Sequence, residues 1–254
     1  MKIIDFHTHP MYDFHKGTHG MEIDLDRFMK DLSSCGIDKA CGCVFYSSMC
    51  NRPEEELESL IVDLNDKALE CKEMMGDFFI PGIQVHPRFK DTSFKELKRC
   101  RDQGVKLVGE LLTAVMGWTE YNTKEFKEIA EYIRELDMTL SIPPFDIKDL
   151  YGFCKDMPGL KIVVGHLKSD GLFEEQLELM RRFENVCFDI SAFATDKDGT
   201  LRYAVDRVGS ERILFGTDYP GINPAGDIAA VLAEKLSFSE KENIFFKNAE
   251  KLLF

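Results

Sequence analysis

The chain has 254 residues, of which 44% are hydrophobic and 30% are charged, the balance of an ordinary globular protein. No apolar run approaches the roughly 18 residues that a membrane span needs, so we expect a soluble protein. The formal net charge of −13 disfavours contact with nucleic-acid phosphates or anionic lipids, and neither nucleic acid nor membrane is an expected partner.

The first residues lack the features of a secretory signal, and the eight cysteines show no pairing framework. We therefore expect a cytoplasmic protein with reduced thiols. Cys41 and Cys43 form a CxC pair inside a strand-like run. Because no second pair follows at a suitable spacing, we predict that these two side chains pack rather than bind metal.

Strand-like and helix-like runs alternate along the chain. Eight apolar, β-branched runs cover residues 2–6, 39–46, 78–85, 105–112, 138–142, 161–166, 186–191 and 212–218. Amphipathic helical runs cover 25–36, 54–75 and 124–137, and a closing helix covers 239–254. Buried strands that alternate with helices predict a parallel sheet covered on both faces. Eight such units at this length favour an α/β fold, a (β/α)8 TIM barrel that forms a single domain over residues 1–254.

Polar residues stand at the ends of several of these strands, where a barrel of this kind carries its active site. His7 and His9 lie two residues apart in the first strand, so their side chains leave the backbone on the same side. Glu110, His166 and Asp218 stand at the ends of the fourth, sixth and eighth strands. Each of these residues alone is typical of a structural role. Together they predict a nitrogen and oxygen ligand set for Zn²⁺ or a similar divalent ion.

With these motifs in place, the sequence resembles the amidohydrolase superfamily, specifically the amidohydrolase-related branch that includes aminocarboxymuconate semialdehyde decarboxylase. The matching stretches are "IIDFHTH", "KLVGE", "MPGLKIVVGH" and "RILFGTDYP", and they span nearly the whole chain. The resemblance implies a distorted (β/α)8 barrel with a divalent metal, commonly zinc. That metal activates water for hydrolysis or, in some members, supports a non-oxidative decarboxylation.

The resemblance also implies roles for the individual residues. His7 and His9 look like the metal ligands of the first strand, and Asp218 looks like the carboxylate that binds metal and handles a proton. Glu110 is similar to the carboxylate of the fourth strand that ligates or bridges metal. His166 resembles the histidine of the sixth strand, which is a second-metal ligand in binuclear members and a catalytic or hydrogen-bonding group in mononuclear ones.

One position departs from the family pattern. Where such proteins usually place a metal-binding histidine at the end of the fifth strand, this chain reads "LSIPPF", with Pro143 at the corresponding position. Proline offers no side-chain donor atom. We therefore expect one ion per chain, held by His7, His9, Asp218 and Glu110. Zinc is the first expectation, with manganese and iron as alternatives.

Three further residues are candidates for an additional ligand or for substrate binding. His86 follows the third strand and precedes a proline, so it is either a ligand or a turn residue. Arg88 and Arg52 lie in loops after the third and second strands. Either arginine would hold a substrate carboxylate through a bidentate fork, or would simply face solvent.

Two groups of residues near the expected site remain open between a functional and a packing role. The first loop, residues 10–24, carries His15 and His19 and either covers the site or is an ordinary surface loop. Trp118 and Tyr121 follow the fourth strand and either wall the pocket or pack.

The leading functional prediction is a metal-dependent hydrolase. In it, a divalent ion would lower the pKa of bound water to about 7 for attack on the carbonyl of a small amide, lactone or ester, with Asp218 and His166 as catalytic residues. The first alternative is a metal-dependent, non-oxidative decarboxylase of an unsaturated acid. The second is a barrel that binds a small molecule without turnover. A homodimer is the expected assembly.

Overall fold

The protein folds as one barrel of eight parallel strands. The computed structural model describes residues 1–10, 23–45, 52–192 and 194–254. Each strand pairs with the next in chain order. The strands are β1 (Ile4–Thr8), β2 (Lys39–Gly42), β3 (Phe79–Ile83), β4 (Leu107–Val108), β5 (Thr139–Ile142), β6 (Lys161–Val164), β7 (Val186–Asp189) and β8 (Ile213–Leu214).

The barrel closes between its last and first strands. The backbone N–H of Phe6 donates to the carbonyl of Phe215 at 2.8 Å, and that of His9 donates to the carbonyl of Tyr219 at 2.8 Å. A parallel bridge also joins Thr8 to Tyr219. The predicted (β/α)8 TIM-barrel fold class is confirmed by this order, pairing and closure.

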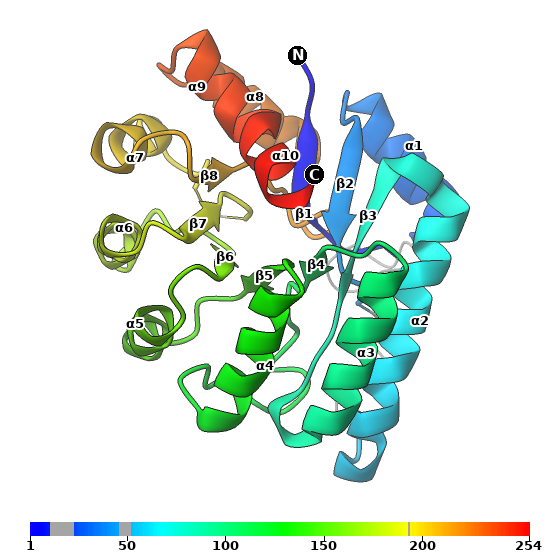
Figure 1. The fold of residues 1–254 in the computed structure, drawn as a ribbon. Helices are drawn as coiled ribbons and strands as arrows, with labels where there is room; N and C mark the ends of the chain where they lie inside the picture. The colour runs from blue at the N-terminus through cyan, green and yellow to red at the C-terminus, as the bar shows by residue number, and fades with distance from the viewer. Residues whose placement is uncertain (11–22, 46–51, 193) are drawn as a thin grey trace.

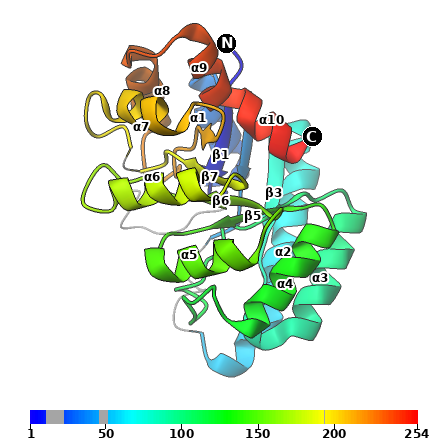
Figure 2. The same ribbon diagram turned by 60° about the vertical axis from the view of Figure 1, so that its left-hand side comes forward.

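Helices connect successive strands and surround them (Figure 1). They are α1 (Leu25–Ser34), α2 (Leu57–Met75), α3 (Lys90–Asp102), α4 (Lys124–Glu135), α5 (Ile147–Asp156), α6 (Phe173–Arg182), α7 (Thr200–Val208), α8 (Pro224–Ala233), α9 (Phe238–Glu242) and α10 (Asn248–Leu253). Figure 2 shows helices on more than one side of the strands. Most of these helices bury apolar side chains along one face, as α4 does with Phe126, Ile129, Ala130 and Ile133.

Local sequence signals explain where several helices begin. The Asp24 carboxylate accepts from the backbone N–H of Arg27 at the start of α1. The Thr123 hydroxyl does the same for Phe126 at the start of α4. These side chains satisfy N–H groups that have no partner inside the first turn of a helix.

Three of the predicted elements differ clearly in the structure. The fourth and eighth strands are only two residues long. The fourth ends early because Gly109 turns the chain with φ +96°, where a Cβ atom would lie 2.1 Å from the carbonyl oxygen of Ser141. The closing helix is divided by a π-helical segment, Asn243–Lys247, between α9 and α10.

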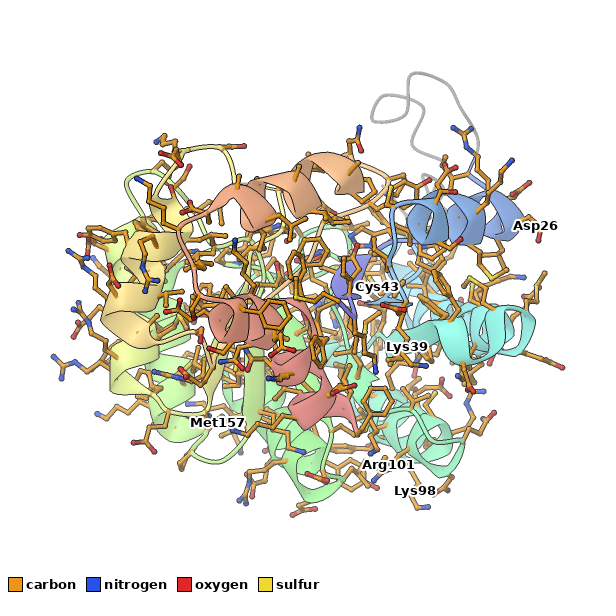
Figure 3. All side chains as sticks on the ribbon, turned by 90° about the horizontal axis from the view of Figure 1, so that it is seen from above. Asp26, Lys39, Cys43, Lys98, Arg101 and Met157 are labelled. Carbon is orange, nitrogen blue, oxygen red and sulfur yellow. The ribbon has the colours of Figure 1, made fainter. Side chains whose placement is uncertain are left out.

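Apolar side chains fill the space between strands and helices, while charged residues such as Asp26 and Lys98 lie at the periphery (Figure 3). The described cysteines are all free and most are buried, including Cys41 and Cys43. Within the described part of the chain, no helix is both long and apolar enough to cross a membrane.

Candidate metal centre

Four of the predicted ligands meet at the carboxyl end of the barrel. His7 and His9 come from β1 and the residue after it, Glu110 follows β4, and Asp218 follows β8. Nε2 of His7 lies 3.1 Å from Oε2 of Glu110 and 3.9 Å from Oδ1 of Asp218. Nε2 of His9 lies 3.1 Å from the same Asp218 oxygen and 3.9 Å from the same Glu110 oxygen. Ligand atoms about 2.1 Å from a tetrahedral ion lie roughly 3.4 Å apart, so this spacing suits one ion.

The outer nitrogens of both histidines fix which nitrogen faces the centre. Nδ1–H of His7 donates to Oδ2 of Asp189 at 2.9 Å, and Nδ1–H of His9 donates to the carbonyl of Cys43 at 3.2 Å. Each Nε2 therefore faces the two carboxylates, as an N–H donor when no ion is bound and as the nitrogen available to a metal when one is. Without an ion, despite the opposing effect of burial, Glu110 and Asp189 raise the pKa of His7 well above its usual range. The ligand atoms of His7, His9 and Glu110 all lie within 4.8 Å of one another, and Asp218 borders this group through its contacts with the two histidines. Such a set of nitrogen and oxygen atoms favours a cation.

Burial strengthens the case for a cation. His7 is 2% exposed and Glu110 is 8% exposed, so both ionisable side chains are shielded from water. Burial alone would raise the pKa of Glu110, but the positive charge of His7 and the hydrogen bond from His166 hold it well below its usual range. Burial also opposes ionisation of Asp218, whose pKa is nevertheless lowered by the hydrogen bond from His9. Both carboxylates are therefore anionic, and the donor set fits a divalent metal.

His166 stands beside these four residues and is held by the end of β7. Its Nε2 lies 3.3 Å from Oε1 of Glu110, and its Nδ1 lies 2.9 Å from the hydroxyl of Ser191. That hydroxyl donates to Asp189 at 2.5 Å, so it accepts from Nδ1–H of His166. Ser191 and Asp189 thus orient the ring while its Nε2 faces the centre.

The backbone at His166 and Asp218 is in the left-handed region, with φ of 59° and 62°. Non-glycine residues in this region are uncommon and concentrate at functional sites. Hydrogen bonds hold both turns in place. The N–H of His166 donates to Asp189 at 3.2 Å, and the N–H of Asp218 donates to the carbonyl of His7 at 2.8 Å.

Asp189 was not predicted from the sequence, although it forms hydrogen bonds with His7 and with the backbone of His166. Its Oδ2 binds His7, and its Oδ1 accepts from Ser191 and His166. It is fully buried. The signal that would have found it is its place as an acidic residue at the end of a buried strand, "VCFDIS", at the same end of the barrel as the other polar groups.

Gln84 was also missed. Its side chain is 1% exposed and spans the segment that carries Glu110. Nε2 donates to the carbonyl of Glu110 at 2.7 Å, and Oε1 accepts from the N–H of Leu112 at 3.0 Å. Asn65 of α2 in turn accepts from the N–H of Gln84 at 2.7 Å. A glutamine in an otherwise apolar run is the signal, since a buried amide needs several partners.

Replacing Asp189 with asparagine is expected to weaken metal binding by about tenfold to a hundredfold. The asparagine NH₂ would donate to Nδ1 of His7 and move the ring proton to Nε2, which removes the lone pair that faces the centre. The measurement is the Mn²⁺ dissociation constant, obtained by competition with a chromogenic chelator. Asp196→Asn removes an exposed carboxylate of the following loop and serves as the control. Equal affinity in the Asp189 and Asp196 variants would contradict this role.

The structure does not bring His86 to the centre. Its Nε2–H donates to the carbonyl of Met116 at 3.0 Å, and its Nδ1 accepts from the N–H of Arg88 at 3.1 Å. Both ring nitrogens are therefore used to hold the short turn that follows β3. Of the two roles considered for His86, the structure supports the turn residue, because neither ring nitrogen is left to bind an ion.

The two arginines considered for substrate binding are paired with acidic side chains outside the centre. Arg88 forms an ion pair with Glu54 and lines a separate cavity that includes Trp118. Nη1 of Arg52 lies 2.8 Å from Oε2 of Glu56. Neither arginine is among the described residues that line the cavity beside Glu110.

The aromatic residues after β4 pack rather than line that cavity. Trp118 contacts the rings of His86, Tyr121 and Phe126. The hydroxyl of Tyr121 donates to the carbonyl of Pro143 at 2.9 Å. His15 and His19 lie outside the described residues.

A cavity of about 310 Å³ opens beside Glu110 and His166. Its wall includes Pro143, so the position at which the family pattern has a histidine is apolar here. In the part of the chain that is described, two groups of side chains are close enough to hold an ion: His7, His9 and Glu110, and His7, His166 and Asp189. Neither group contains a residue of β5. The mononuclear ligand set His7, His9, Glu110 and Asp218 therefore stays a prediction that this geometry supports.

A family model described as "Amidohydrolase" matches residues 49–254, most of the chain. The chain belongs to the amidohydrolase family. This match confirms the resemblance inferred from the strand-end motifs and supports an enzyme of the amidohydrolase superfamily. No curated protein sequence matches the chain.

Several solved structures share the fold of this amidohydrolase-family protein. A 2,6-dihydroxybenzoate decarboxylase from Rhizobium is 15% identical with a TM-score of 0.76, and the match covers 100% of this chain and 98% of that one. A 5-carboxyvanillate decarboxylase from Novosphingobium aromaticivorans DSM 12444, complexed with manganese and 4-hydroxy-3-methoxy-5-nitrobenzoic acid, is 18% identical with a TM-score of 0.74 over 99% and 96%. A dihydroxybenzoic acid decarboxylase from Polaromonas sp. JS666, with manganese and the inhibitor 2-nitroresorcinol, is 15% identical with a TM-score of 0.79 over 99% and 96%.

These comparisons correct the functional prediction. Hydrolysis of an amide, lactone or ester was the leading expectation and is wrong, because most of the similar solved structures are metal-dependent decarboxylases. The stated alternative, decarboxylation, agrees with them. A divalent metal is supported by the ligand cluster and by the manganese in two of these structures, whereas zinc is not confirmed.

Proposed function

We propose that this protein is a divalent-metal-dependent, non-oxidative decarboxylase of a small aromatic or unsaturated carboxylic acid. The observation that carries the proposal is the cavity of about 310 Å³, whose wall joins the predicted ligand Glu110 and the oriented imidazole of His166 to an apolar surface. A cavity of this size holds a single substituted ring. The decarboxylases that share the fold act on compounds of that kind.

In this proposal His7, His9, Glu110 and Asp218 hold the ion, with Asp189 fixing the ring of His7. When bound, the ion supplies a fixed positive charge that stabilises negative charge on substrate oxygens. Manganese is the first ion to test, with zinc and iron as alternatives. The two carboxylates and two imidazoles are compatible with each of the three ions.

His166 is the proposed proton donor. As the bond between the substrate carbon and its carboxylate breaks, the electron pair stays on that carbon and takes a proton from Nε2 of His166, while CO₂ leaves. The overall change is RCOO⁻ + H⁺ → RH + CO₂, which needs no oxidant or reductant. Ser191 holds Nδ1 of His166 so that Nε2 stays directed at the cavity. The apolar wall around Pro143 excludes water from the carbon that is protonated.

The proposal is tested with protein supplied with Mn²⁺ and a panel of hydroxybenzoates and unsaturated acids, following CO₂ release and the loss of acid absorbance. We expect at least one acid to be decarboxylated, with activity lost on chelation and restored by Mn²⁺. Matched amides and methyl esters of the same acids control for hydrolysis. Hydrolysis of those derivatives without CO₂ release from any acid would contradict the proposal, as would tight binding of the acids without turnover under any divalent ion.

A further inference from the structure

The cavity beside the candidate metal centre carries a cation that neither the strand-end motifs nor the proposed reaction uses. Lys168 lies on the wall of the 310 Å³ cavity, together with Glu110 and His166. Among the described residues that line this wall, Lys168 is the only lysine or arginine. Arg52 and Arg88, considered from the sequence as carboxylate-binding residues, lie elsewhere and pair with Glu56 and Glu54.

The backbone of Lys168 is fixed by the same elements that hold His166. Gln176 of α6 is fully buried and forms hydrogen bonds with the backbone of two residues of this turn. Its Oε1 accepts from the N–H of Lys168 at 2.8 Å, and its Nε2 donates to the carbonyl of His166 at 3.3 Å. Between them, the N–H of Leu167 donates to the carbonyl of Asp189 at 2.8 Å. The turn is therefore anchored, and the origin of the Lys168 side chain is set relative to His166.

The part of the cavity wall formed by the turn after β5 is apolar, unlike the part that carries Glu110, His166 and Lys168. Pro143, Pro144 and Phe145 follow one another there and line the cavity. None of the three has a side-chain hydrogen-bonding atom. The carbonyl of Pro143 accepts from the Tyr121 hydroxyl, which fixes the first residue of the turn. A flat apolar ring suits such a surface, because the ring buries no polar atom and so carries no free-energy cost for an unpaired hydrogen-bonding group.

We propose that Lys168 is the specificity-determining residue for the substrate carboxylate, and that the substrate is a small aromatic monoacid whose ring packs against Pro143, Pro144 and Phe145. This inference rests on the proposed function and names its substrate class. The ammonium group of Lys168 forms a charge-assisted hydrogen bond to the carboxylate in the partly dehydrated cavity. Because the carboxylate charge is lost as neutral CO₂ leaves, this bond is strongest in the substrate complex, and Lys168 acts through substrate affinity.

The test is calorimetric titration of the Mn²⁺-supplied protein with salicylate and with salicylamide, a neutral compound of nearly the same shape. We expect Lys168→Met to weaken salicylate binding by about tenfold to a hundredfold and to leave salicylamide binding unchanged. Lys168→Arg keeps the charge and is expected to retain more of the salicylate affinity. Lys148→Met removes an exposed lysine of α5 that lines a different cavity and is the control for the change in net charge.

Three results would overturn the inference: salicylate binding by Lys168→Met within about twofold of the wild type, equal weakening of both compounds, or no binding of either compound by the wild-type protein. The proposed function fails in a different way, through the absence of CO₂ release from every acid. The ratio of salicylate affinities between the wild type and Lys168→Met does not depend on turnover. The two failures are therefore distinguishable.

Discussion

Replacing His7 and His9 together with alanine is expected to give a protein that binds no divalent ion and has lost decarboxylation by about a thousandfold or more. Both Nε2 atoms face Glu110 and Asp218, and their removal leaves two carboxylates without the nitrogen half of the ligand set. The measurements are metal content by inductively coupled plasma mass spectrometry and CO₂ release. Circular dichroism establishes that the variant is folded.

His86→Ala is the matched control for the double variant. It also removes a buried imidazole at the carboxyl end of a strand, but one whose two nitrogens bond to the backbone. We expect it to lose stability and keep its metal. A folded His7→Ala/His9→Ala protein with the metal content of the wild type would contradict the assignment of these residues as ligands.

His166→Gln is expected to lower kcat by about a hundredfold to ten-thousandfold, the range over which a positioned general acid contributes. Glutamine fills a similar volume and retains a hydrogen bond to Ser191, but it has no proton to deliver near neutral pH. Metal content is expected to stay at the wild-type value because His166 is outside the proposed ligand set. Steady-state kinetics of CO₂ release and metal analysis of the same preparation check both statements.

The kinetic control for that variant is His86→Gln, which changes a histidine outside the cavity in the same way. A His166→Gln protein with the kcat of the wild type would assign the proton to another group. Loss of the metal in His166→Gln would instead make His166 a ligand.

Much of the fold could be predicted because burial on both faces leaves a clear pattern in the sequence. Most strands are short, largely apolar runs, and helices such as α2 and α4 carry an apolar face at helical spacing. The lengths of β4 and β8 were less predictable. The strands themselves end at Val108 and Leu214, while the apolar residues that follow them, Leu111 and Phe215, are buried as well.

The centre could be predicted in part because its residues stand at strand ends. His7, His9, Glu110, His166 and Asp218 are brought together by the parallel order of the strands alone. Asp189 and Gln84 act through hydrogen bonds to those residues, which depend on the exact course of the chain. The same is true of Lys168, which lines the cavity beside Glu110, whereas Arg88 lines another cavity.

The reaction could not be predicted from these motifs. Two imidazoles and two carboxylates suit a divalent ion equally in a hydrolase and in a decarboxylase. The difference lies in what surrounds the ion. The apolar turn Pro143–Phe145 and the lysine on the cavity wall belong to loops, which vary independently of the barrel.

The most direct test of the account is the metal content of wild-type protein purified without chelators or an affinity-metal column, by inductively coupled plasma mass spectrometry. We expect about one manganese, zinc or iron per chain, held by the proposed ligands His7, His9, Glu110 and Asp218. No bound metal, even after Mn²⁺, Zn²⁺ and Fe²⁺ have each been supplied, would contradict it.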